Sequence, residues 1–96
     1  MSELSEEQAD ELLAIAQGLM RTLSVEAGVF CAKHGKFDHR DINKARLALL
    51  EIALEGSLIC YFEEQERVPL MRGISHNVQT VLRLRQNTEK RQRFDA

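Results

Sequence analysis

The chain has no Trp, a single Pro and only five Gly among its 96 residues. Loops and tight turns depend on Gly and Pro, so their scarcity predicts long regular elements joined by few loops. Two cysteines are too few for a disulfide scaffold of the secreted kind, and we expect reduced thiols in a cytoplasmic setting. The apolar content of 44% is that of a globular protein and argues against a disordered chain.

We also expect no secretory signal and no membrane-spanning segment. The acidic start MSELSEEQADE lacks the basic and apolar regions of a secretory signal. The longest apolar stretch, ARLALLEIALEGSLICYF, is interrupted by Glu51 and Glu55 and falls short of the roughly 20 residues of a membrane span. We interpret it as a core helix and expect no membrane contact.

Charge is distributed unevenly along the chain. Residues 1–30 carry six acids and one base, residues 31–66 seven acids and five bases, and residues 67–96 two acids and seven bases. Acidic and basic segments could face each other in the fold or across a dimer. The other interpretation is that the basic end meets an anionic partner.

The first helix is predicted over residues 6–33. Ser5 begins the motif SEEQ, a capping box that satisfies the first free N–H groups of a helix. Gly18 and Gly28 each weaken a helix by about 1 kcal/mol relative to Ala, but we still expect one continuous helix. Apolar residues recur at spacings of three and four, which places them on one helical face: Ala9, Leu12, Ala16, Leu19, Leu23, Ala27 and Phe30.

The second helix is predicted over residues 39–66. Gly35 suits the left-handed position after a helix, and Asp38 can cap the next helix through its carboxylate. A short connection between two helices of nearly equal length, each on the order of 40 Å, predicts an antiparallel hairpin. From Ile42 to Phe62 apolar side chains point in nearly every direction, so this helix needs to be covered on several sides.

The third helix is predicted over residues 70–88, starting near Pro69, whose missing N–H suits a first helical position. Its apolar stripe stops where Arg85 replaces the next apolar residue, so residues 86–96 are expected to form an exposed basic tail. The stripe consists of Leu70, Met71, Ile74, Val78, Val81 and Leu82. The sequence therefore predicts an all-α fold in one domain over residues 1–96: a long antiparallel helical hairpin (6–33 and 39–66), a third helix, and a dimeric helical bundle.

The segment CAKHGKFDHR places Cys31, His34 and His39 within nine residues. Cys31 and His34 have a helical i, i+3 spacing, and Asp38 or His39 could add further metal ligands. A structural zinc site usually needs four ligands, and Cys60 lies about 30 Å away along the second helix. We therefore interpret the segment as the corner between two helices, and we expect no metal and no cofactor.

Catalytic motifs are missing from the sequence. It contains no Glu-x-x-His pair, no His-Glu-x-x-His, no Gly-rich phosphate loop and no Gly-x-Ser-x-Gly. Glu51 and Glu55 lie one helical turn apart and are interpreted as a solvated polar strip. A nucleophile made from Cys31 and His34 would lack an oxyanion donor and an orienting third group. We expect no enzymatic activity and no catalytic residue.

The segment RGISHNVQTVLRLRQ, residues 72–86, resembles the second half of a bacterial helix-turn-helix over about 15 residues. The resemblance depends on Gly73 at the turn, Ser75 as helix cap, and Val78 and Leu82 as core positions. It implies that the helix after Ser75 faces DNA. Pro69, however, stands where that family has a small residue. The competing interpretation is an ordinary third helix capped by Ser75, with solvated arginines.

Two functional hypotheses follow. The first is a non-catalytic helical interaction or regulatory protein (an adaptor, chaperone-like protein or assembly subunit) that forms a homodimer and binds an unidentified protein partner. Its expected contact face is on the second helix: Leu47, Leu50, Leu54, Leu58, Tyr61 and Phe62. The alternative is a nucleic-acid-binding regulator, whose expected contacts are Ser75, His76, Asn77, Gln79, Thr80, Arg83, Arg85, Lys90, Arg91 and Arg93.

Overall fold

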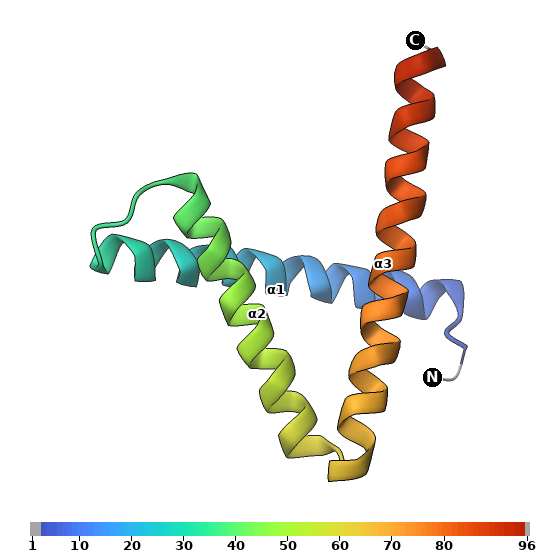
Figure 1. The fold of residues 1–96 in the computed structure, drawn as a ribbon, viewed down its shortest axis with the longest axis horizontal. Helices are drawn as coiled ribbons and strands as arrows, with labels where there is room; N and C mark the ends of the chain where they lie inside the picture. Colours follow the sequence, from blue (N-terminus) through green and yellow to red (C-terminus); the bar gives the residue numbers. More distant parts are fainter. Residues whose placement is uncertain (1–2, 96) are drawn as a thin grey trace. The chain divides into compact units, whose positions relative to one another are not determined.

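The computed structural model describes residues 3–95, which form three helices: α1 (Glu6–Lys33), α2 (His39–Tyr61) and α3 (Glu64–Asp95) (Figure 1). The described residues contain no strand, so the predicted all-α fold is confirmed. The chain divides into two compact units, residues 1–55 and 56–96, and the boundary falls inside α2. The single domain and the dimeric bundle stay predictions.

Helix α1 has the bounds predicted from the sequence. Ser5 forms the expected capping box: its Oγ accepts from the N–H of Gln8 at 3.1 Å, and its own N–H donates to Oε1 of Gln8 at 3.0 Å. The helix continues through Gly18 and Gly28 without a break. One continuous first helix is therefore confirmed.

The end of α1 is a complete Schellman turn. Gly35 adopts φ of 68°, the left-handed conformation that only Gly reaches without strain. The N–H of Lys36 donates to the carbonyl of Cys31 at 2.8 Å, and the N–H of Gly35 donates to the carbonyl of Ala32 at 3.2 Å. Asp38 then accepts from the N–H of Arg40 at 2.9 Å through Oδ1, so it caps α2 as predicted.

Helices α1 and α2 form a hairpin that packs closely only near its turn. Ala27 and Cys31 of α1 are buried, with 0% and 2% of their surface exposed, and Ile42 and Leu49 of α2 are half-buried. Residues 6–22 of α1, in contrast, are all exposed. Figure 1 shows the two helices crossing obliquely, so that α2 leaves α1 beyond the region of contact.

The junction between α2 and α3 differs from the prediction. Helix α2 ends at Tyr61 instead of residue 66, and α3 begins at Glu64 instead of residue 70. The acidic segment EEQE, residues 63–66, is therefore a helix start and not a helix end. Carboxylates favour the positive N-terminal end of a helix. In addition, the N–H of Glu63 donates to Oε2 of Glu66 at 3.2 Å, which is one half of a capping box.

Pro69 lies inside α3, at its sixth residue, so the predicted start at Pro69 is wrong. Proline there removes one hydrogen bond of the second turn, and the rest of the helix forms around it. The far end of α3 also passes the predicted limit of residue 88 and reaches Asp95. Residues 86–93 contain no Gly or Pro, and they are exposed and helical.

Candidate interaction surface

The helices expose most of their apolar stripes. Among the residues whose side chains are described, only three apolar ones are buried: Ala27, Cys31 and Leu58. Large apolar side chains on all three helices remain more than half exposed, for example Leu19 on α1, Leu47 on α2 and Val78 on α3. Scattered exposed apolar residues are common, but whole stripes that lie open mark sites of association.

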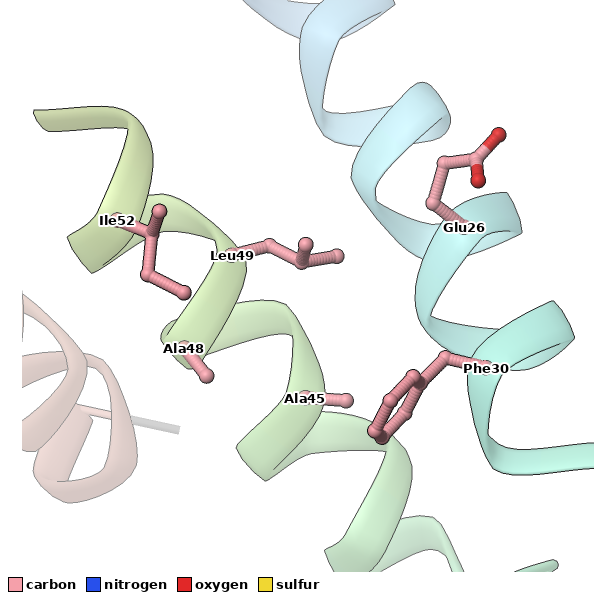
Figure 2. Close-up of a pocket in the computed structure, with 6 residues that line it drawn as sticks. All are labelled: Glu26, Phe30, Ala45, Ala48, Leu49 and Ile52. Carbon is pink, nitrogen blue, oxygen red and sulfur yellow. The ribbon is translucent and has the colours of Figure 1, made fainter. Parts of the chain in front are cut away.

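An apolar groove of about 300 Å³ lies between α1 and α2 beside the turn. Figure 2 shows Phe30 of α1 and Leu49 of α2 pointing into the space between the helices, while the carboxylate of Glu26 points away from α2. The remaining lining residues are Ala45, Ala48 and Ile52 of α2. Apart from Glu26, the lining of the groove is apolar.

The residues of the contact face predicted on α2 differ in exposure. Leu47, Leu50 and Tyr61 are exposed, with 81% of the Tyr61 surface open to solvent. Phe62 is exposed too and lies just beyond the end of α2, whereas Leu54 is half-buried. Leu58 differs, because only 9% of its surface is exposed and it belongs to the small core of residues 56–96.

Arg67 organises the junction of α2 and α3, a role that the sequence analysis missed. Its Nε donates to the carbonyls of Leu58 and Phe62, and its Nη2 donates to the carbonyl of Ile59, all at 3.2 Å. The last carbonyls of a helix have no partner within the helix, and a guanidinium can supply one. The only available signal was an arginine a few residues after a helix end.

The residues predicted to contact nucleic acid all lie along α3, and several of them bond within that helix. The hydroxyl of Thr80 donates to the carbonyl of His76 at 2.9 Å, and Nε2 of Gln79 donates to Oγ of Ser75 at 3.3 Å. The basic members are exposed: Arg83, Arg85, Lys90, Arg91 and Arg93. They form an open, positively charged end of α3, whose contact with nucleic acid stays a prediction.

The turn of a helix-turn-helix is missing from α3. The helix runs without interruption from Glu64 to Asp95, so Gly73 is an interior helical residue and has no positive φ. Ser75 is likewise interior and caps no helix, which makes both interpretations of Ser75 as a cap wrong. The resemblance fails because α3 continues through Gly73, and one glycine costs a long helix only about 1 kcal/mol.

The segment CAKHGKFDHR forms a helical corner, as interpreted. Cys31 is buried, and the ring of His34 lies against Phe30 with centroids 4.7 Å apart. Within the described part of the chain, no three Cys, His, Asp or Glu side chains gather in a group that could hold a metal ion. Cys60 is exposed and, like Cys31, a free thiol.

By length and composition alone, α1 would be able to cross a membrane. A mostly buried core helix of a soluble protein and a signal sequence near the N-terminus pass the same test, and only 6% of this window is buried. Arg21 and Glu26 interrupt the apolar part of α1.

Comparison of the chain with protein-family models, with curated proteins and with solved structures finds no match.

Proposed function

We propose that this chain is a non-catalytic helical interaction protein that acts as a homodimer. The observation that carries the proposal is the set of open apolar stripes. Among the residues whose side chains are described, only Ala27, Cys31 and Leu58 are buried apolar ones, and large apolar side chains on all three helices stay more than half exposed. Burial of apolar area is the main driving force of association.

The number of open apolar side chains favours an obligate assembly over a transient contact. Obligate dimers typically bury about 2,000 Å² or more in total, counted over both partners, and their interfaces are the more hydrophobic ones. A second copy also brings an identical set of open stripes, and two-fold homodimers are the commonest assemblies of soluble proteins.

The exposed stripe of α2 supplies the contact face in this proposal. Leu47 and Leu50 lie on one side of the helix, followed by Leu54 one turn later. The groove between α1 and α2 is lined by Ala45, Ala48, Leu49 and Ile52, which lie on the opposite side of α2 and are not part of this contact face. The assembled dimer then presents its remaining surface to a further protein, as an adaptor or assembly subunit does.

Sedimentation equilibrium of the purified chain tests the proposal. We expect a dimer at micromolar concentration, and a shift toward monomer when Leu47→Glu and Leu50→Glu place two charges on the contact face. The matched control carries Leu47→Met and Leu50→Met, which keep volume and polarity and should leave the dimer intact. A parent chain that stays a compact monomer at all concentrations would overturn the proposal.

The open basic end of α3 favours a second candidate, a nucleic-acid-binding regulator. Fluorescence anisotropy with labelled duplex and single-stranded DNA, at about 50 and 200 mM salt, tests it, because released counterions make phosphate contacts strongly salt-dependent. Salt-sensitive binding that weakens with Arg83→Ala and Arg85→Ala supports this candidate. No binding at the lower salt concentration excludes it.

A further inference from the structure

The basic side chains of α3 do not all lie on the same side of the helix. Residues separated by a whole number of helical turns share a side, and eleven positions make about three turns. Arg83 lies eleven positions after Arg72, and Lys90 lies seven positions, or about two turns, after Arg83. The three cations therefore form a row along one side of α3, about 27 Å long. All three side chains are exposed, and we call them the cationic row.

The cationic row has no acidic neighbour on its own helix. On a helix surface the neighbours of a side chain are the residues three and four positions away. None of these positions around Arg72, Arg83 or Lys90 holds Asp or Glu. The neighbours of Arg83 are polar and uncharged: Gln79, Thr80, Gln86 and Asn87. The row is therefore a strip of positive charge flanked by hydrogen-bonding groups.

Arg85 lies on the other side of α3, although it is exposed and only two positions from Arg83. Two helical positions rotate a side chain by about 200°. Arg85 follows Val81 by one turn and Val78 by two turns, so it extends the apolar stripe. Glu89 follows Arg85 by four positions, and opposite charges at that spacing attract each other. Arg83 and Arg85 thus carry the same charge on opposite sides of the helix, and only Arg83 lacks an acidic neighbour.

The cationic row exists because α3 is continuous. A turn at Gly73, as in a helix-turn-helix, would place Arg72 in a different helix from Arg83. Helix α3 instead continues through Gly73 and brings the two arginines into line. Of the basic residues predicted to contact nucleic acid, Arg83 and Lys90 belong to the row and Arg85 does not. Arg72 was not among the predicted contacts.

We infer that the cationic row binds the phosphate backbone of duplex nucleic acid, independently of base sequence. The inference rests on the second candidate function, nucleic-acid binding, and names the face that carries it. A row of cations without acidic neighbours suits a ligand whose negative charges repeat at short, regular intervals. The amides of Gln86 and Asn87 beside the row can donate to phosphate oxygens. A duplex is favoured over a single strand because single-strand binding uses stacking on aromatic side chains, and residues 64–93 contain no Phe, Tyr or Trp.

Equal charge changes on opposite sides of α3 test the face. Arg83→Gln removes one member of the cationic row, and Arg85→Gln removes the same charge on the other side. A double variant, Arg72→Gln with Lys90→Gln, removes the other two members. Fluorescence anisotropy measures the affinity of each full-length variant for two labelled duplex DNAs of unrelated sequence and for single-stranded DNA of the same length. The titrations are repeated at several salt concentrations between about 50 and 200 mM.

Arg83→Gln should weaken duplex binding about tenfold at about 50 mM salt, and it should lower the slope of log affinity against log salt by about 0.9, because one phosphate contact is lost. The double variant should weaken binding about a hundredfold, whereas Arg85→Gln should bind within about twofold of the parent and keep its slope. Both duplexes should bind alike, and the single strand should bind more weakly. Circular dichroism checks that all variants keep the helical content of the parent.

Two results would overturn the inference while leaving nucleic-acid binding intact. Equal losses for Arg83→Gln and Arg85→Gln would show that DNA responds to the net charge of α3 and not to one face. A preference for the single strand, or for one of the two duplexes, would show that the bases are read.

Two further results would reach beyond the face. Displacement of the labelled duplex by polyglutamate at an equal concentration of negative charge would show that the row binds any polyanion, including an acidic protein segment, and would overturn the inference. A parent chain that binds no DNA at about 50 mM salt would refute the second candidate function itself.

Discussion

Nε of Arg67 donates to the carbonyl oxygen of Leu58 at 3.2 Å, across the two residues that separate α2 from α3. The same guanidinium reaches the carbonyls of Ile59 and Phe62. One side chain thus adds donors to carbonyls at and just beyond the end of α2, where the carbonyl of Leu58 also accepts from the N–H of Phe62 at 3.3 Å. Leu58 is the one buried apolar side chain in the described part of residues 56–96, so Arg67 holds the backbone of the residue that forms the core of that unit.

Replacing Arg67 by Ala should lower the free energy of unfolding by about 1–3 kcal/mol, because three carbonyls lose a charged donor and the bond to Leu58 is part-buried. Urea unfolding followed by circular dichroism measures the loss. Arg72→Ala, an exposed position on the same helix, serves as the control and should stay within about 0.5 kcal/mol of the parent. Equal stability of the two variants would show that the guanidinium bonds contribute nothing.

Ala27→Leu should destabilise the α1–α2 hairpin by about 1–3 kcal/mol, because Ala27 is fully buried where the two helices approach each other and a larger side chain must push them apart. Thermal unfolding at one fixed protein concentration measures the effect. Ala14→Leu changes volume equally at an exposed position of α1, and we expect it to be nearly neutral. A stable Ala27→Leu variant would mean that the helices are not in contact there.

Gly35→Ala should cost about 1–2 kcal/mol, because L-residues are strained at positive φ. The space around the added Cβ is open, so the cost comes from the backbone alone. Gly18→Ala, inside α1 with equally open space, should instead stabilise by about 0.5–1 kcal/mol. In chemical denaturation we expect the midpoint to fall below that of the parent for Gly35→Ala and to rise above it for Gly18→Ala. Changes in the same direction would contradict the Schellman turn.

The two thiols should react with a disulfide reagent at very different rates. Cys60 is exposed and should react in the native state, whereas Cys31, with 2% of its surface exposed, should react only after the hairpin opens. Absorbance kinetics on the parent and on the single variants Cys31→Ser and Cys60→Ser assign the phases. Fast reaction of Cys31 in native protein would contradict the packing at the turn.

Local signals made α1 predictable. Each of its signals depends on residues no more than five positions apart: the capping box at Ser5, the regular stripe and the left-handed Gly35. Each one forms as the sequence indicates. The α2–α3 junction was mispredicted because two local signals compete there. Pro69 favours a helix start, but the carboxylates of residues 63–66 provide an earlier one, and the rest of α3 tolerates the proline.

The candidate contact face was only partly predictable. A stripe on α2 shows which side chains share a side of the helix, and Leu47 and Leu50 are indeed exposed. The sequence pattern cannot show which side chains of the stripe are buried by other residues of the same chain. Leu58 is covered because α3 begins soon after α2 ends, and the position of that start depended on the junction that was mispredicted.

The sequence by itself determined the helical class, the bounds of α1, the caps of the hairpin turn and the opposite charges at the two ends of the chain. Those features depend on hydrogen bonds and periodicity between residues a few positions apart. Only the tertiary structure decided that the hairpin packs through Ala27 and Cys31 and that Arg67 reaches back to Leu58. Packing and side-chain bonds of that kind join residues that local propensity treats as independent, so they exist only once the helices have been placed against each other.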